Sequence, residues 1–240
     1  MLRDTGSIRH QNDLIATALI TVAWTEKLGV VGRVRGAALN LRSELEDGVV
    51  LGVNIVDPDD SEYDFDPERR QTSEVLDEVG RLAGGPILVS LSGGNPALQA
   101  LAPLIRAGHE RGHSFALETQ GSVAQPWFTE LDHLTLSPKG PSSGHLTPLG
   151  EIEACLEAAD GRPETVFKLV IFDDADFDYA RELAANYGDY RFFLQVGNPV
   201  PAGEPEPAEL MRRYRWLVGR TLEAGWYAAT VLPQLHVLAW

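Results

Sequence analysis

Short runs of β-branched and other apolar residues alternate with helical patterns over most of this 240-residue chain, from about Gly85 onward. Such alternation is typical of consecutive strand–helix units around a parallel sheet. We therefore expect an α/β fold, and the length allows a single domain. The strands that the pattern predicts are Ile87 to Ser92, Ser114 to Glu118, His133 to Ser137, Val166 to Phe172, Arg191 to Val196 and Thr230 to Leu238.

Between these strands, apolar side chains recur at spacings of three and four residues, which predicts helices with one buried face. The clearest example is the segment from Ala97 to Arg111, with apolar residues at Leu98, Leu101, Leu104 and Ile105. The same spacing predicts helices from Ile152 to Ala159, Phe177 to Tyr187 and Ala208 to Ala224. The aspartates Asp173, Asp174, Asp176 and Asp178 are expected to cap the start of a helix and to favour its dipole.

The first 60 residues have weaker periodicity, so we treat residues 1–60 as an atypical segment ahead of residues 61–240. The apolar run from Leu14 to Trp24 is too short to cross a bilayer and predicts a strand or a buried helix. The acidic stretch from Asp57 to Asp66 is expected to be a loop.

Charge and cysteine content narrow the classes of function. Thirty-five acidic residues against twenty basic ones give a net charge of −15, which disfavours nonspecific binding to nucleic acid. A small-molecule ligand is therefore the better expectation. The single cysteine, Cys155, excludes an intrachain disulfide and fits a cytoplasmic protein without a membrane segment. We expect its thiol to be a small buried hydrophobic group.

Polar and glycine-containing segments follow three consecutive predicted strands, namely Ser92-Gly-Gly-Asn95, Glu118-Thr-Gln-Gly121 and Ser137-Pro-Lys139. Paired glycines let a backbone approach a ligand closely, and a carboxylate suits the two hydroxyls of a ribose. A rigid Ser-Pro turn followed by lysine offers a hydroxyl, carbonyls and a cation. Each segment alone also fits an ordinary turn. Because ligands bind α/β folds at the carboxyl ends of strands, the three together favour a ligand site.

In this order the three segments resemble the 7-carboxy-7-deazaguanine synthases, radical S-adenosylmethionine enzymes of queuosine and 7-deazapurine biosynthesis. The resemblance covers roughly Gly85 to Trp240 and includes Phe167-Lys168-Leu-Val-Ile and Leu194-Gln-Val-Gly-Asn198. It implies a partial (β/α)6 TIM-like barrel that binds S-adenosylmethionine, a [4Fe-4S] cluster and Mg²⁺. It also implies a carbon–nitrogen lyase that converts 6-carboxy-5,6,7,8-tetrahydropterin to 7-carboxy-7-deazaguanine with loss of ammonia. Such an enzyme needs an external electron donor, and a homodimer is left open.

The resemblance also implies roles for individual residues. Ser92 would contact the pterin, and Ser61 would contact Mg²⁺. Asn95 stands where the family more often has a glutamate, which weakens the expected contact with the amino group of the cofactor. Glu118 would bind the ribose. The residues expected to contact S-adenosylmethionine are Gly93, Gly94, Asn95, Glu118, Ser137, Pro138 and Lys139.

The sequence departs from the family where the family binds its cluster. The Cys-x3-Cys-x2-Cys pattern is missing, and the segment that aligns best with it, Leu51 to Ser61, contains no cysteine. Three thiolates leave one iron open for S-adenosylmethionine, and no other side chain replaces them readily. Three explanations remain open: a changed reading frame ahead of Ser61, a relative that binds the cofactor or the pterin without radical chemistry, or a Mg²⁺-dependent enzyme that uses Asp57, Asp59 and Asp60.

Overall fold

A computed structural model describes residues 18–21, 39–42, 49–54, 65–70, 72–83, 85–92, 95–198 and 207–234. Seven strands form one sheet in the order β1-β5-β6-β7-β8-β9-β10. They are β1 (Ala18–Thr21), β5 (Leu88–Ser92), β6 (Ser114–Thr119), β7 (His133–Leu136), β8 (Glu164–Ile171), β9 (Arg191–Val196) and β10 (Thr230–Leu232). Neighbours pair in parallel, as in β8 and β9, where Lys168 lies opposite Phe193.

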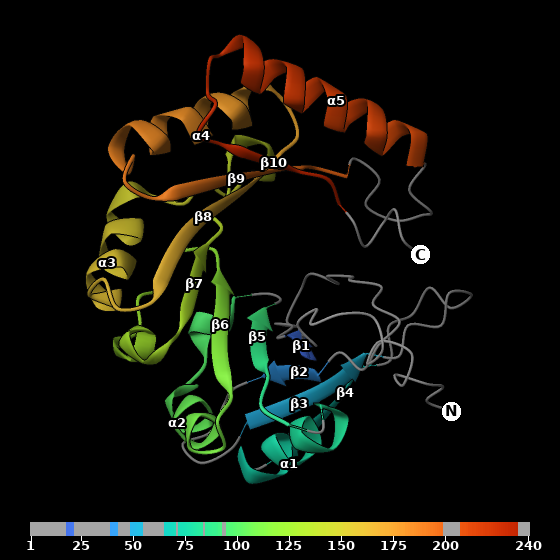
Figure 1. The fold of residues 1–240 in the computed structure, drawn as a ribbon, viewed down its shortest axis with the longest axis vertical. Helices are drawn as coiled ribbons and strands as arrows, with labels where there is room; N and C mark the ends of the chain where they lie inside the picture. Colours follow the sequence, from blue (N-terminus) through green and yellow to red (C-terminus); the bar gives the residue numbers. More distant parts are fainter. Residues whose placement is uncertain are drawn as a thin grey trace. The chain divides into compact units, whose positions relative to one another are not determined.

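Helices connect the parallel strands (Figure 1). They are α1 (Thr72–Ala83), α2 (Ala102–Glu110), α3 (Leu149–Ala159), α4 (Asp174–Asn186) and α5 (Pro207–Glu223), with short 3-10 turns η2 (Pro96–Leu98), η3 (Pro126–Glu130) and η4 (Pro141–Ser143). This arrangement confirms the expected α/β fold. In the strand order, β1 and β10 stand at the two ends.

The chain divides into two compact units, which we describe separately. The first contains the residues up to Leu117 together with Glu130–Asp132, and it includes β1, β5, most of β6, α1 and α2. The second contains Glu118–Thr129 and the residues from His133 onward, with β7 to β10 and α3 to α5. The expectation of a single domain stays a prediction.

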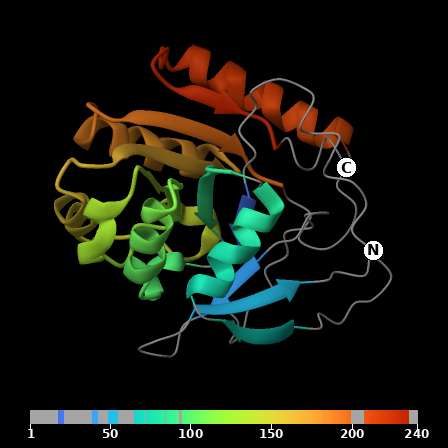
Figure 2. The same cartoon turned by 60° about the horizontal axis from the view of Figure 1, so that its bottom comes forward.

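The first unit also contains a small antiparallel sheet that the sequence pattern did not predict. Its strands are β2 (Leu39–Arg42), β3 (Val49–Asn54) and β4 (Phe65–Arg70), which are the blue and blue-green arrows in Figure 2. Phe65 and Asp66 therefore belong to a strand, so the predicted acidic loop was wrong for these two residues. The remainder of that loop, residues 57–64, lies outside the described residues. The apolar run from Leu14 to Trp24 was predicted to form a strand or a buried helix. Strand β1, which lies within it, confirms the strand.

Close packing in the first unit depends on a glycine. Gly108 on α2 lies so near Phe115 that an added Cβ would come within 2.3 Å of the ring. The same Cβ would be 3.4 Å from Leu76 on α1. All three residues are buried, and Leu76 and Phe115 have no exposed surface. The absence of a side chain at Gly108 thus lets α1, α2 and β6 share one core.

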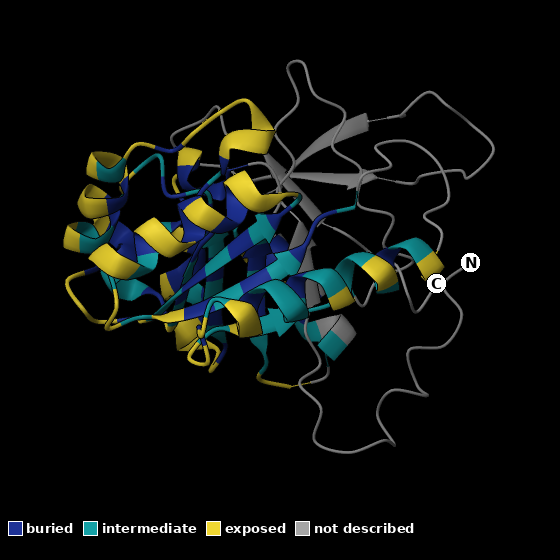
Figure 3. Ribbon diagram, turned by 90° about the horizontal axis from the view of Figure 1, so that it is seen from above, coloured by how far each residue is buried: buried dark blue, intermediate teal, exposed yellow. Residues whose placement is uncertain are grey.

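The helices of the second unit follow one another along one face of its strands (Figure 1). Phe167 on β8 stacks on Phe192 of β9 at 4.9 Å between ring centroids, and Trp226 beyond α5 approaches Phe192 at 5.7 Å. Figure 3 shows the result, with exposed stripes on the outer sides of the helices and buried strands beneath. No described helix is long and apolar enough to span a membrane.

The predicted helices were largely confirmed, but the first was wrong at its start. The chain forms the turn η2 and then a helix beginning at Ala102. Pro103 explains why the helix begins at Ala102, because proline lacks an N–H group and is tolerated only in the first helical turn. As a consequence Leu98 is not on a buried helix face, as the prediction had it, and the residue is 46% exposed. The last strand ends at Leu232, and residues 235–240 lie outside the described part of the chain.

Candidate functional site

The strands of the second unit have one face covered by helices and one face that is only partly buried. Phe167 and Phe192 lie on the covered face, where they contact Tyr187 and Trp226. Because side chains alternate along a strand, the neighbouring positions lie on the other face. Those positions are half-buried and include polar side chains, namely Glu118, Thr135, Lys168 and Gln195. This polar face is the candidate site.

An ion pair crosses the polar face. The ammonium of Lys168 on β8 donates hydrogen bonds to both carboxylate oxygens of Glu118 on β6, at 2.8 and 2.9 Å. The two side chains are 24% and 34% exposed, so water reaches both only in part. In the strand order β7 lies between β6 and β8, so the pair spans the width of one strand. It fixes the Glu118 carboxylate in one place on the polar face.

Lys139 adds a second ammonium to the same site. Burial lowers its pKa, the negative charge of Glu118 opposes this effect, and the positive charge of Lys168 adds to it. The chain has three lysines among its twenty basic residues, and two of them, Lys139 and Lys168, lie here. In a protein of net charge −15, this site therefore has two cations and one anion.

The segment that carries Lys139 is held by its own backbone and by Thr147. The N–H of Ser137 donates to the carbonyl of Thr119 at 2.7 Å, which joins the ends of β7 and β6. The N–H of Lys139 donates to the hydroxyl oxygen of Thr147 at 3.1 Å, and that hydroxyl donates to the carbonyl of Gln120 at 3.4 Å. Thr147 is 4% exposed. One buried hydroxyl thus connects two of the segments that the sequence singled out.

Asp176 holds the next part of the same loop. Its carboxylate accepts hydrogen bonds from the N–H of Ser142 at 3.0 Å, the hydroxyl of Ser142 at 2.6 Å and the N–H of Phe172 at 2.9 Å. Asp176 lies in the first turn of α4, as the prediction of a favourable interaction with the helix dipole requires, but the residue is 1% exposed and its carboxylate binds the loop. The cap is Asp173, whose carboxylate accepts from the N–H of Asp176 at 3.1 Å.

The ends of β8 and β9 are joined by an arginine and a close contact. Arg213 on α5 donates to the carbonyls of Phe172 at 2.7 Å and Gly197 at 3.2 Å. The Phe172 ring packs so closely on Gly197 that an added Cβ would lie 2.6 Å from it. Only glycine fits this position without displacing the ring.

The site residues predicted in the first unit are only partly described. Ser92 is the last residue of β5, which is where the predicted strand ends, and it is half-buried. Asn95 is 6% exposed, and its side-chain oxygen accepts from the N–H of Ala97 at 3.3 Å, so it caps η2. Gly93 and Gly94 lie outside the described residues, as does Ser61. The ligand contacts expected of these residues stay predictions.

The second unit contains the other predicted site residues at the ends of its strands. Glu118 is the penultimate residue of β6, and Ser137 directly follows the last residue of β7. Ser137 and Pro138 are buried, whereas Lys139 is half-buried. Glu118 lies near enough to Lys139 to act on its pKa, and the contact of these residues with a ligand stays a prediction.

The residues do not fit a [4Fe-4S] cluster. Cys155, the chain's sole cysteine, is 0% exposed in α3. Burial raises the pKa of its thiol to about 11, and the charge of Glu151 acts in the same direction. A cluster needs thiolates, and this thiol stays protonated at neutral pH. Within the described residues, no group of three or more His, Cys, Asp or Glu side chains is placed to hold a metal ion.

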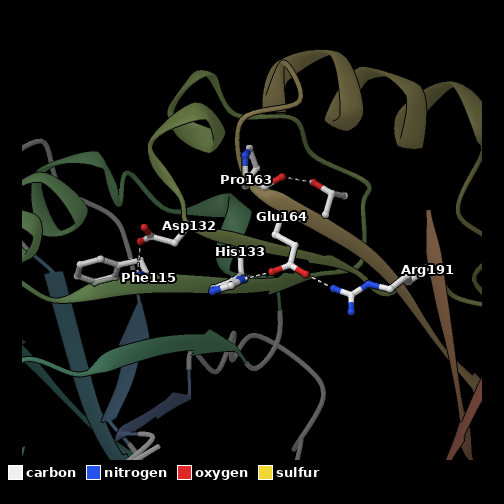
Figure 4. A network of polar contacts seen from close by, with 7 residues as sticks. Phe115, Asp132, His133, Pro163, Glu164 and Arg191 are labelled. Atoms are coloured by element: carbon white, nitrogen blue, oxygen red, sulfur yellow. Dashed lines mark hydrogen bonds and ion pairs between the residues drawn. The ribbon is translucent and has the colours of Figure 1, made fainter. Parts of the chain in front are cut away.

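A second polar network lies at the opposite ends of the strands (Figure 4). Glu164 at the start of β8 lies between His133 and Arg191, which begin β7 and β9, and it pairs with both. These side chains are 45% to 63% exposed. Because exposed ion pairs contribute little, and function lies at the carboxyl ends in such folds, we assign this network to the packing of the strand starts.

A cavity of about 230 Å³ also lies away from the polar face. It is lined by residues of α4 and by Tyr190, Phe192 and Trp226. The Arg181 guanidinium lies over the Trp226 ring, 5.0 Å from its centroid. Phe192 belongs to the face of β9 that packs against helices, and none of the predicted site residues lines the cavity.

Sequence reasoning missed the roles of Lys168, Thr147 and Asp176. A lysine within the apolar run Val166-Phe-Lys-Leu-Val170 was a usable signal, because a charge inside a strand must find a partner. Nothing in the local sequence pointed to Thr147. The acidic run predicts Asp176 at the start of a helix, where it lies, but does not indicate its contacts with Ser142.

Comparison with known proteins gives a consistent set of relatives. The chain is 37% identical over 182 residues to the 7-carboxy-7-deazaguanine synthase of Bacillus cereus, covering 73% of this chain and 76% of the relative. It is 39% identical over 176 residues to the synthase of that name from Bacillus subtilis, covering 70% and 72%. A crystal structure of QueE from Escherichia coli aligns with a TM-score of 0.49 at 18% identity, over 73% of this chain and 70% of that one. No protein-family model matches the sequence.

Proposed function

Because this chain belongs to the family of 7-carboxy-7-deazaguanine synthases, we propose that its second unit binds the adenosine part of S-adenosylmethionine without generating a radical from it. The observation that carries this proposal is the meeting of Glu118, Lys139 and Lys168 on one polar face. Glu118 would accept hydrogen bonds from the ribose hydroxyls, and Ser137, Pro138 and Lys139 would lie along the adenosine. When bound, S-adenosylmethionine would bring a sulfonium, an ammonium and a carboxylate to the site.

The geometry supports binding because the polar groups are fixed before a ligand arrives. Thr147 and Asp176 hold the loop that carries Lys139, and Lys168 holds Glu118. A pre-organised site loses less conformational entropy on binding, so more of each contact becomes affinity. The two ammonium groups favour a ligand that carries a carboxylate.

The cysteine content argues against radical chemistry in this chain. The family reaction requires an electron delivered through a cluster bound by three thiolates. This chain has one thiol, which is buried in α3 and protonated. We therefore propose a binding role, and we route no chemical step through a cluster.

Titration calorimetry of the full chain with S-adenosylmethionine tests the proposal. We expect saturable binding by the natural chain and a loss of about tenfold or more in affinity for Glu118→Ala, because a charge-assisted contact is removed. Glu164→Ala is the matched control, since it removes a strand carboxylate from the opposite ends of the strands. Absence of binding by the natural chain, or equal loss in the control, would contradict the proposal.

The family's own lyase reaction is the second candidate, and the identities of 37% and 39% to proteins named as synthases favour it. It would convert 6-carboxy-5,6,7,8-tetrahydropterin to 7-carboxy-7-deazaguanine, with Ser92 contacting the pterin, Ser61 contacting Mg²⁺, and Gly93, Gly94 and Asn95 contacting the cofactor. The test is an anaerobic assay with the pterin, S-adenosylmethionine, Mg²⁺, iron, sulfide and a reductant. Product detected by mass spectrometry would overturn the binding-only proposal.

The DNA sequence of the gene tests whether a changed reading frame accounts for the missing cluster cysteines. Translating the DNA upstream of the Ser61 codon in the other two frames would reveal a Cys-x3-Cys-x2-Cys pattern if the frame had changed. Finding that pattern would favour the lyase reaction for the restored chain. Its absence would favour a relative that has lost the cluster.

A further inference from the structure

We propose that Lys168 is a positioning residue that orients Glu118 to accept a hydrogen bond from one ribose hydroxyl, and this rests on the adenosine site proposed above. Its ammonium nitrogen lies almost equally far from the two carboxylate oxygens of Glu118, at 2.8 and 2.9 Å. A single contact to one oxygen would leave the carboxylate free to rotate. The double contact holds the plane of the carboxylate in one orientation.

The contact leaves acceptor capacity for a ligand. An ionised carboxylate has about four acceptor positions, two on each oxygen. Lys168 uses one position on each oxygen, so each oxygen retains one. Because Lys168 lies between the two oxygens, the remaining positions point outward on opposite sides of the carboxylate, and either one can accept a single ribose hydroxyl. Glu118 is 34% exposed, so a ligand can reach these positions.

A lysine suits this task better than an arginine. Arginine provides seventeen of the twenty basic residues of the chain, yet lysine occupies this position. A guanidinium is planar and engages both oxygens through a fork, extending over the space beside them. An ammonium is compact and reaches the carboxylate from one side. Lys168 can therefore hold Glu118 while leaving room for the ligand.

Lys168 also keeps Glu118 from turning toward Lys139. The charge of Glu118 acts on both lysines, so without Lys168 the carboxylate has one remaining cation nearby. A carboxylate drawn toward Lys139 would face the loop after β7 and would present its oxygens in another direction. Removal of Lys168 should thus change selectivity for the ribose hydroxyl as well as affinity.

The test compares ligands that differ by one hydroxyl. The full chain and its Lys168→Met variant are titrated calorimetrically with adenosine, 2′-deoxyadenosine and 3′-deoxyadenosine. We expect the natural chain to prefer adenosine by about tenfold over the deoxynucleoside that lacks the bound hydroxyl, the effect of one lost charge-assisted hydrogen bond. In Lys168→Met, adenosine affinity should fall by about tenfold while the affinity for that deoxynucleoside changes by less than about twofold. A purely structural role would weaken all three ligands together.

Controls make each outcome decisive. Arg191→Met removes the cation of the other cross-strand pair and should leave the preference intact. Lys168→Gln retains a hydrogen-bond donor and replaces Lys168→Met if circular dichroism shows that the latter does not fold. A natural chain that binds neither adenosine nor S-adenosylmethionine contradicts the proposed function itself. Binding with no preference for adenosine, or a preference that survives in the variant, overturns the role of Lys168 and leaves the adenosine site standing.

Discussion

The carboxylate of Asp176 accepts hydrogen bonds from both the backbone N–H and the hydroxyl of Ser142, 34 residues earlier in the chain. Asp176 lies in the first turn of α4, and Ser142 lies in the loop that begins with Lys139. The pair therefore connects a helix that packs on the covered face of the sheet with a loop at the candidate site. Gly140 is required beside it, because an added Cβ would lie 2.6 Å from the Asp176 carboxylate.

Asp176→Asn should destabilise the protein by about 2–4 kcal/mol, because a buried amide offers an N–H group where the loop also presents donors. Urea denaturation followed by circular dichroism measures the change. Asp178→Asn is the matched control, since it lies on the same helix and its side chain is 72% exposed. Equal stability of the two variants would contradict the role of Asp176.

Lys139→Met should stabilise the protein by roughly 0.5–1 kcal/mol at neutral pH while weakening the binding of S-adenosylmethionine. Burial lowers the pKa of Lys139, so the folded chain binds fewer protons than the unfolded chain across the alkaline range below the usual lysine value of 10.5. Stability of the natural chain should rise with pH in that range, and the advantage of the variant should shrink.

Urea denaturation at a series of pH values from 7 to about 10.5 tests this expectation. Arg162→Met is the control for net charge, because it removes one exposed cation. An advantage for Lys139→Met that stays constant with pH would show that the burial of its charge is not the cause.

Gly197→Ala should cost about 1–3 kcal/mol of stability, because the new methyl group would overlap the Phe172 ring. Gly219→Ala in α5 is the matched control, since a Cβ added there would meet nothing within 4 Å apart from its chain neighbours and the backbone of its own helix. We expect that control to be neutral or stabilising by up to about 1 kcal/mol, because alanine favours a helix. Thermal melting of both variants provides the comparison.

Cys155→Ala should leave the iron content unchanged after anaerobic incubation with iron and sulfide, because this thiol does not bind a cluster. In the natural chain the thiol should react with a disulfide reagent only slowly until the chain is unfolded, since its pKa is about 11 and it is fully buried. The variant should lose about 1 kcal/mol through the small cavity it creates. Stoichiometric cluster absorption by the natural chain would contradict the ligand argument.

The sequence predicted the secondary structure of the described residues between 85 and 234 well, because one-sided burial leaves a periodic pattern in each element. The strand Arg191–Val196 was predicted with the bounds that the structure shows, and α5 begins and ends one residue before the prediction. The pattern was wrong at Leu98, where Pro103 moved the start of the helix. The antiparallel strands before residue 70 were not predicted, because their periodicity is weak.

The sequence also determined which chemistry the site has available: the carboxylate of Glu118, the cation of Lys139 and the lack of cluster thiolates. Only the tertiary structure decided which groups meet. Lys168 lies 50 residues from Glu118, and Asp176 lies 34 residues from Ser142. Such pairs arise because parallel strands bring distant residues to neighbouring positions on one face, and no local pattern of spacing records that alignment.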